Sequence, residues 1–127
     1  MRLALGLLVL SAVVFAVTGM VYLFVPGLAL SVVGIEPGAT TDFLLRTEGV
    51  ALLTGAAFLA ALATRPTSSL WLALVALGGY YVLGSLIDLQ AFADDVVGPA
   101  SVPSAMVRIG LGMLAFGAAL RIRKPST

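Results

Sequence analysis

Residues 3–25 read LALGLLVLSAVVFAVTGMVYLFV and contain no charged side chain. About 18 or more consecutive apolar residues form a helix long enough to cross the hydrocarbon core of a bilayer. The same stretch follows Arg2 and has small residues near Ala16, as the apolar part of a secretory signal does. Because it is longer than the apolar part of a signal, we expect a retained membrane helix.

Three similar apolar stretches follow, and each is bounded by turn-forming or capping residues. Pro26 and Gly27 end the first stretch, and a loop over residues 26–41 follows, with an apolar middle that suits the membrane interface. Thr41 or Asp42 is the expected cap of the second helix. The third helix follows a tight turn at residues 64–67, with Ser68 or Ser69 as its cap, and residues 93–103 form the last loop. The predicted helices are 3–25, 42–63, 68–92 and 104–122. The sequence therefore predicts an all-α fold, a bundle of four transmembrane helices running up-down-up-down, in one membrane domain over residues 1–127.

The composition excludes several classes of function. The chain is 61% hydrophobic and 10% charged, with a mean hydropathy of +1.14, which is too apolar for a water-soluble domain. A net charge of +1 without a basic patch argues against nucleic-acid binding. Cys and His are absent, which removes thiol chemistry and the commonest metal ligands, so we predict no metal site. Because no catalytic motif is present either, the sequence favours a function other than catalysis.

The charges outside the predicted spans separate by sign. The acids flank one set of helix ends, and the bases flank the other set together with Trp71. The acidic set is Glu36, Asp42, Asp94 and Asp95, and the basic set is Arg2, Arg65, Arg121, Arg123 and Lys124. Because short cytoplasmic segments are enriched in Lys and Arg, this separation predicts that both termini are cytoplasmic.

The second and fourth helices contain a similar pattern. Arg46 precedes Gly55-Ala56-Ala57, and Arg108 precedes Gly117-Ala118-Ala119 at the same spacing. The pattern predicts two helical hairpins related by a pseudo-twofold axis along the membrane normal. The alternative is chance, because Gly and Ala are common in membrane helices.

Four ionisable residues lie inside the predicted spans, at positions 46, 48, 88 and 108. All lie within two turns of the outer helix ends, roughly 5–10 Å below the interface at 1.5 Å per residue. A charge near the centre of a span costs about 2.5–3.5 kcal/mol on insertion scales, and partnered charges inside a bundle are the usual solution. Since the third and fourth helices form a hairpin, Asp88 and Arg108 reach similar depth, and we expect them to pair. Glu48 is the expected further partner of Arg108, or of Arg46 in another subunit.

Small residues predict where the helices pack closely. Arg46 and Glu48 are two positions apart and point to nearly opposite sides of their helix. We expect Glu48 to share a packing stripe with Gly55, and Gly110 to share the corresponding stripe with Gly117. Close helix contacts are also expected at Gly78, Gly79 and Gly84.

The polar residues of the outer half form a candidate binding site. Tyr80, Gly84 and Asp88 recur at four-residue spacing, and Tyr81 lies one heptad before Asp88. A glycine gap beside polar groups suits a headgroup or a small amphipathic ligand. The predicted site comprises Arg46, Glu48, Tyr80, Tyr81, Asp88 and Arg108. Its candidate ligands are a quinone as cofactor, a lipid headgroup or a small anion.

Two other functions fit the same residues. In the first, the charges only orient the helices or reach out to the membrane surface, and the Gly and Ala faces bind a membrane-protein partner or a second copy of the chain. In the second, the protein is a small proton-coupled transporter. That function is disfavoured because Glu48 and Asp88 both lie near one surface and the first helix has no acid.

Three short motifs carry a family resemblance. They are Phe24-Val25-Pro26-Gly27 at the end of the first helix, Arg46-Thr47-Glu48-Gly49 ahead of a Gly-Ala run, and Arg108 opening a Gly-rich fourth helix. In these features the chain resembles the DoxX-like group of small four-helix membrane proteins of bacteria. The resemblance implies a bacterial cytoplasmic membrane location and a quinone-linked or accessory role. The Cys residues of some redox relatives are absent here, which argues against a redox role.

Overall fold

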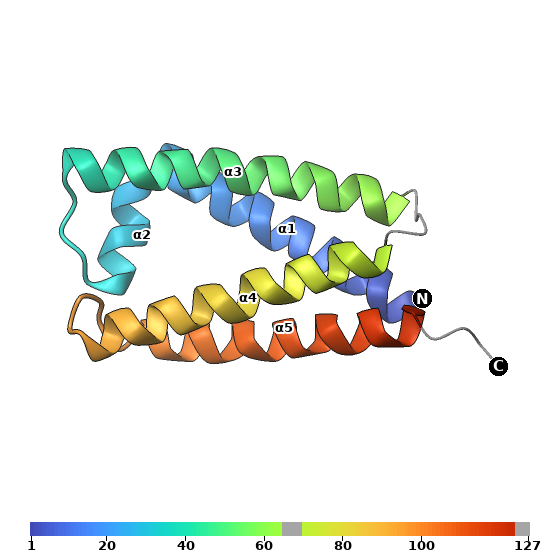
Figure 1. Ribbon diagram of the computed structural model, residues 1–127. Helices are drawn as coiled ribbons and strands as arrows, with labels where there is room; N and C mark the ends of the chain where they lie inside the picture. The colour runs from blue at the N-terminus through green and yellow to red at the C-terminus, as the bar shows by residue number, and fades with distance from the viewer. Residues whose placement is uncertain (65–69, 124–127) are drawn as a thin grey trace. The chain divides into compact units, whose positions relative to one another are not determined.

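The computed structural model describes residues 1–64 and 70–123, and it is all-α (Figure 1). Its helices are α1 (Arg2–Phe24), α2 (Pro26–Val33), α3 (Ala39–Thr64), α4 (Leu70–Ala93) and α5 (Ser101–Arg123). Four of them, α1, α3, α4 and α5, are long and apolar enough to cross a membrane. The predicted fold class is therefore confirmed, and the chain is a multi-pass integral membrane protein.

The chain divides into two compact units. The α1–α3 unit comprises Leu8–Thr64, and the α4–α5 unit comprises Met1–Leu7 together with Arg65–Thr127. In each unit, two long helices run antiparallel and approach each other at a pair of glycines. This division matters for the candidate site because Asp88 and Arg108 belong to one unit and Arg46 and Glu48 belong to the other.

In the α4–α5 unit, α4 buries mainly large side chains and α5 buries small ones. Leu70, Leu74 and Tyr81 are buried on α4. Across from them, α5 buries only small side chains, namely Ser101, Ala105, Gly112, Ala115, Ala118 and Ala119. Small residues let two helix backbones come close, which is how helices associate in lipid.

The closest approach of α4 and α5 occurs at Gly78 and Gly112. A Cβ added to Gly78 would lie 3.0 Å from the carbonyl oxygen of Gly112, and one added to Gly112 would lie 3.0 Å from the carbonyl oxygen of Gly78. The predicted contact at Gly78 is confirmed. On α5 the prediction was wrong: an added Cβ at Gly110 or Gly117 meets nothing within 4 Å, and the same holds for Gly79 on α4.

The α1–α3 unit has its own glycine crossing. A Cβ added to Gly19 would lie 2.8 Å from the carbonyl oxygen of Gly49, and the reverse distance is also 2.8 Å. The buried face of α3 continues from Gly49 through Leu52, Ala56 and Leu59. Gly55, predicted to share the packing stripe with Glu48, lies at the side of this face, where an added Cβ would be 3.2 Å from the Phe15 ring.

The sequence predicted a loop over residues 26–41, but part of this segment is helical. Residues Pro26–Val33 form the short helix α2. Pro26 has no N–H to continue α1, but its fixed φ suits the first turn of a new helix. The apolar stretch that the sequence placed in the interface is this helix.

Two helices start three residues earlier than predicted. The helix α3 begins at Ala39, because Thr41 caps it from inside: its hydroxyl accepts a hydrogen bond from the Gly38 N–H at 2.8 Å and donates to the Gly38 carbonyl at 2.9 Å. The helix α5 begins at Ser101 rather than after Pro103. A proline in the first turn costs no helical hydrogen bond, since those N–H groups have no partner within the helix.

The predicted turn at residues 64–67 lies outside the described residues, except for Thr64, which is the last residue of α3. The predicted caps Ser68 and Ser69 also lie outside the described residues. The predicted relation of the two hairpins by a pseudo-twofold axis stays a prediction.

Candidate functional site

An ion pair joins α4 and α5 in the halves nearest their connection. The Nη2 atom of Arg108 contacts the Oδ2 atom of Asp88, as the equal depth of the two residues predicted. Both side chains are about one-third accessible, at 29% for Arg108 and 37% for Asp88. The pair therefore lies at the edge of the hairpin, where another molecule can reach it.

The rest of the Arg108 guanidinium lies over the glycine gap of α4. Its Nη1 atom would be 3.9 Å from a Cβ added to Gly84, so the gap predicted at Gly84 holds this arginine. Its Nε atom is buried and has no hydrogen-bond partner among residues 1–64 and 70–123. A guanidinium has five N–H donors, and a donor left unpaired in an apolar medium costs several kcal/mol. An outside molecule cannot reach this buried atom, but the accessible part of the guanidinium has further N–H donors for an acceptor oxygen.

The two tyrosines of the predicted site have different environments. Tyr81 is buried at 2% accessibility, whereas Tyr80 is 43% accessible. Their rings pack edge to face with centroids 5.8 Å apart. Tyr81 belongs to the core of the α4–α5 unit. Tyr80 is the tyrosine that an outside molecule can contact. On α4 it lies one helical turn before Gly84 and two turns before Asp88.

The other two predicted site residues, Arg46 and Glu48, are on α3 and belong to the α1–α3 unit. Both are exposed, and they flank the buried Gly49 on opposite sides, as their two-residue spacing predicted. Within the described part of the chain, neither forms an ion pair or a side-chain hydrogen bond. The predicted pairing of Glu48 with Arg108 would join residues of two different units and stays a prediction, as does the pairing of Glu48 with Arg46 of a second copy.

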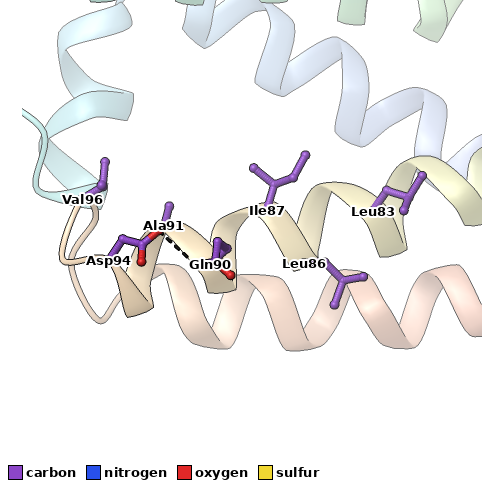
Figure 2. A pocket seen from close by; sticks show the side chains of 7 residues that line it. All are labelled: Leu83, Leu86, Ile87, Gln90, Ala91, Asp94 and Val96. Carbon is purple, nitrogen blue, oxygen red and sulfur yellow. Dashed lines mark hydrogen bonds between the residues drawn. The ribbon is translucent and has the colours of Figure 1, made fainter.

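The sequence analysis missed a shallow groove along the C-terminal half of α4 (Figure 2). Apolar side chains line most of it. Its end near the α4–α5 connection is polar, because Gln90 Nε2 donates a hydrogen bond to Asp94 Oδ2 at 3.0 Å. The lining residues are Leu83, Leu86, Ile87, Gln90, Ala91, Asp94 and Val96. The spacing of Leu83, Ile87 and Ala91 by four residues could have identified this face.

Comparisons with protein-family models, curated proteins and solved structures find no match to this chain. The resemblance to the DoxX-like group therefore stays a prediction. Among the described residues, no group of three or more carboxylates could hold a metal ion.

Proposed function

We propose that this integral membrane protein binds the polar head of a small amphipathic molecule at Arg108 and Asp88. One observation supports the proposal most directly. Arg108 is 29% accessible and forms one ion pair among the described residues, with Asp88, so its guanidinium has N–H donors beyond the one used for Asp88. An acceptor oxygen on a ligand would satisfy donors that the protein leaves unpaired.

The ligand class follows from the surroundings of Arg108. The guanidinium accommodates an oxygen acceptor, such as a quinone carbonyl, a lipid phosphate or a small anion. The accessible Tyr80 ring and the apolar groove on α4 offer contact area to a ring or an acyl chain on the same helix. A molecule with one oxygen-rich end and one apolar part fits both features, as a quinone or a lipid does.

The experiment compares ligands and variants of the full chain in detergent. Thermal unfolding is followed with a short-chain benzoquinone, with phosphatidylglycerol and with inorganic phosphate, each added separately. We expect stabilisation by at least one of these probes in the wild type and its loss in Arg108→Ala, with Arg46→Ala as the matched control on α3. The proposal fails if no probe stabilises the wild type, or if Arg108→Ala responds as the wild type does.

A second function is favoured by the ion pair itself. Because Asp88 already neutralises Arg108, the pair also fits a structural role in holding the α4–α5 hairpin, in a subunit that binds another membrane protein. That function predicts a stoichiometric companion when the chain is isolated gently from native membranes. Copurification of a stoichiometric companion, together with no response to any of the three probes, would favour it over ligand binding.

A further inference from the structure

The end of the α4–α5 unit opposite to the candidate site carries arginines and the only tryptophan of the chain. Trp71 is the second residue of α4, and Arg123 is the last residue of α5. The guanidinium carbon of Arg123 lies 5.1 Å from the centroid of the Trp71 ring, which is a cation–π contact. Arg121 lies in the same last turn of α5, and Arg2, the first residue of α1, belongs to the same compact unit.

Among the described residues of the α4–α5 unit, no Asp or Glu lies near these arginines. The nearest acid on α4 is Asp88, nearly five turns beyond Trp71, which is about 25 Å at 1.5 Å per residue. An ion pair needs a distance of about 4 Å or less between nitrogen and oxygen, so Asp88 cannot pair with these arginines. No described acidic side chain of this unit therefore neutralises the arginines, which leaves them able to bind an external anion.

The position of Arg2 supports the same conclusion. A cation at the first position of a helix is opposed by the positive end of the helix dipole, and α1 has no acid in its first turn. Arg121 and Arg123, in contrast, occupy the favourable end of α5. An external anion at this end would offset the repulsion at Arg2 while binding the two arginines of α5.

We propose that Arg2, Arg121 and Arg123, with Trp71, bind the phosphate groups of anionic phospholipids in the adjacent leaflet. Guanidinium groups bind phosphate oxygens through two parallel hydrogen bonds, and tryptophan favours the headgroup region of a bilayer. The Trp71 ring orients Arg123 while leaving its N–H edges free for phosphate. This proposal does not rest on ligand binding at Asp88 and Arg108, and it does not use Arg65 or Lys124, which lie outside the described residues.

The single tryptophan makes the site directly observable. The full chain is reconstituted into phosphatidylcholine vesicles that contain increasing amounts of phosphatidylglycerol, with bromine on the acyl chains of one lipid at a time. Quenching of Trp71 fluorescence then gives the relative affinity of the two lipids next to this residue. We expect phosphatidylglycerol to be preferred, and we expect the preference to fall as sodium chloride is raised from 50 to 500 mM, about threefold in Debye length.

The variants test which side chains carry the preference. One kcal/mol per arginine at an anionic surface corresponds to about a fivefold change in affinity. The double variant Arg121→Gln with Arg123→Gln should therefore lose about fivefold to thirtyfold of the preference. The control Arg46→Gln, which removes an arginine of the α1–α3 unit, should keep the preference. The variant with lysine at both positions checks folding and should keep most of the preference.

Three outcomes would overturn the proposal. They are equal quenching by the two brominated lipids in the wild type, an unchanged preference in the double glutamine variant, and loss of the preference when inorganic phosphate replaces chloride at equal ionic strength. The last outcome would mean that free phosphate, and not a phospholipid, occupies this end.

Discussion

Asp95 is the only residue other than glycine with a positive φ in the described chain, at 56°. It ends α4 in the left-handed conformation, and the next N–H, that of Val96, donates to the Ala91 carbonyl at 2.8 Å. Gly34 ends α2 in the same way, with φ at 77° and the Ile35 N–H bonded to the Leu30 carbonyl. Both ends are Schellman motifs, in which glycine is the favoured residue.

We therefore expect Asp95→Gly to stabilise the protein. The substitution relieves the left-handed strain of a residue with a Cβ and removes a negative charge from the negative end of the α4 dipole. We expect a gain of about 0.5–1.5 kcal/mol in the free energy of unfolding, measured by titration with sodium dodecyl sulfate. Gly34→Ala is the converse control and should lose about 1 kcal/mol. Destabilisation by Asp95→Gly would show that its side chain makes a contact worth more than the strain.

The Asp88–Arg108 pair should stabilise the α4–α5 hairpin measurably. Removing one partner of a fully buried pair costs about 3–5 kcal/mol, and the one-third exposure of these two side chains reduces the expected cost to about 1–2 kcal/mol. We expect Asp88→Asn and Arg108→Gln to be less stable than the wild type, and the double variant to be less destabilised than the sum of the two. Additive losses in this double-mutant cycle would contradict a direct pair.

Sequence reasoning found this pair but chose the wrong glycines around it. The pair was predictable because antiparallel helices of a short-loop hairpin bring Asp88 and Arg108 to equal depth. Gly110 was preferred to Gly112 as the contact residue, although positions two apart point about 160° away from each other on a helix. Arg108 already indicated which face of α5 packs against α4, because Gly112 lies one turn after Arg108 on the same side of the helix. The groove on α4 was missed because its apolar residues look like any lipid-facing surface in a sequence.

The two hairpins are built alike in packing but not in charge. Each has a glycine crossing, at Gly19 and Gly49 in one and at Gly78 and Gly112 in the other. The arginine of α3, Arg46, has no equivalent of Asp88, because α1 contains no acidic residue. Even if the halves arose by duplication, only the α4–α5 hairpin has the components of the proposed site.

Alanine substitutions should separate contact glycines from open ones. At Gly112 a Cβ would lie 2.7 Å from the Val82 side chain and 3.0 Å from a backbone oxygen, so the helices must move apart. We expect Gly112→Ala to cost about 1–3 kcal/mol in the free energy of unfolding, as overpacked cores do. Gly110→Ala, two positions away on the same helix, meets nothing within 4 Å and should be neutral or stabilise by up to about 1 kcal/mol.

The same comparison can be made on α4, with Gly78→Ala as the contact substitution and Gly79→Ala as the control. Equal effects of the contact and control substitutions on both helices would show that the hairpin does not pack at the Gly78–Gly112 crossing.

The four helices and the separation of charge along them predict the topology of the protein in the membrane. Four spans bring the two ends of the chain to the same side, and the arginines next to those ends favour the cytoplasmic side. The connection between α4 and α5 should then face outward. This connection contains Asp94 and Asp95, which follow the last residue of α4, whereas Trp71 lies at the beginning of α4.

The absence of cysteine allows a direct test of this topology. Ala100→Cys places one thiol in the exposed connection between α4 and α5, and Ser126→Cys places one after the end of α5. In intact cells, a membrane-impermeant maleimide should label the Ala100→Cys variant and leave the Ser126→Cys variant unlabelled until the membrane is opened. The opposite labelling pattern would show that the topology is the reverse of the predicted one. The basic end would then face the outer leaflet, and the Asp88–Arg108 pair would be open to ligands from the cytoplasmic side. Labelling of both variants in intact cells would place residues 100 and 126 on the same, outer side of the membrane. An even number of spans would then separate them, and α5 would not cross the membrane.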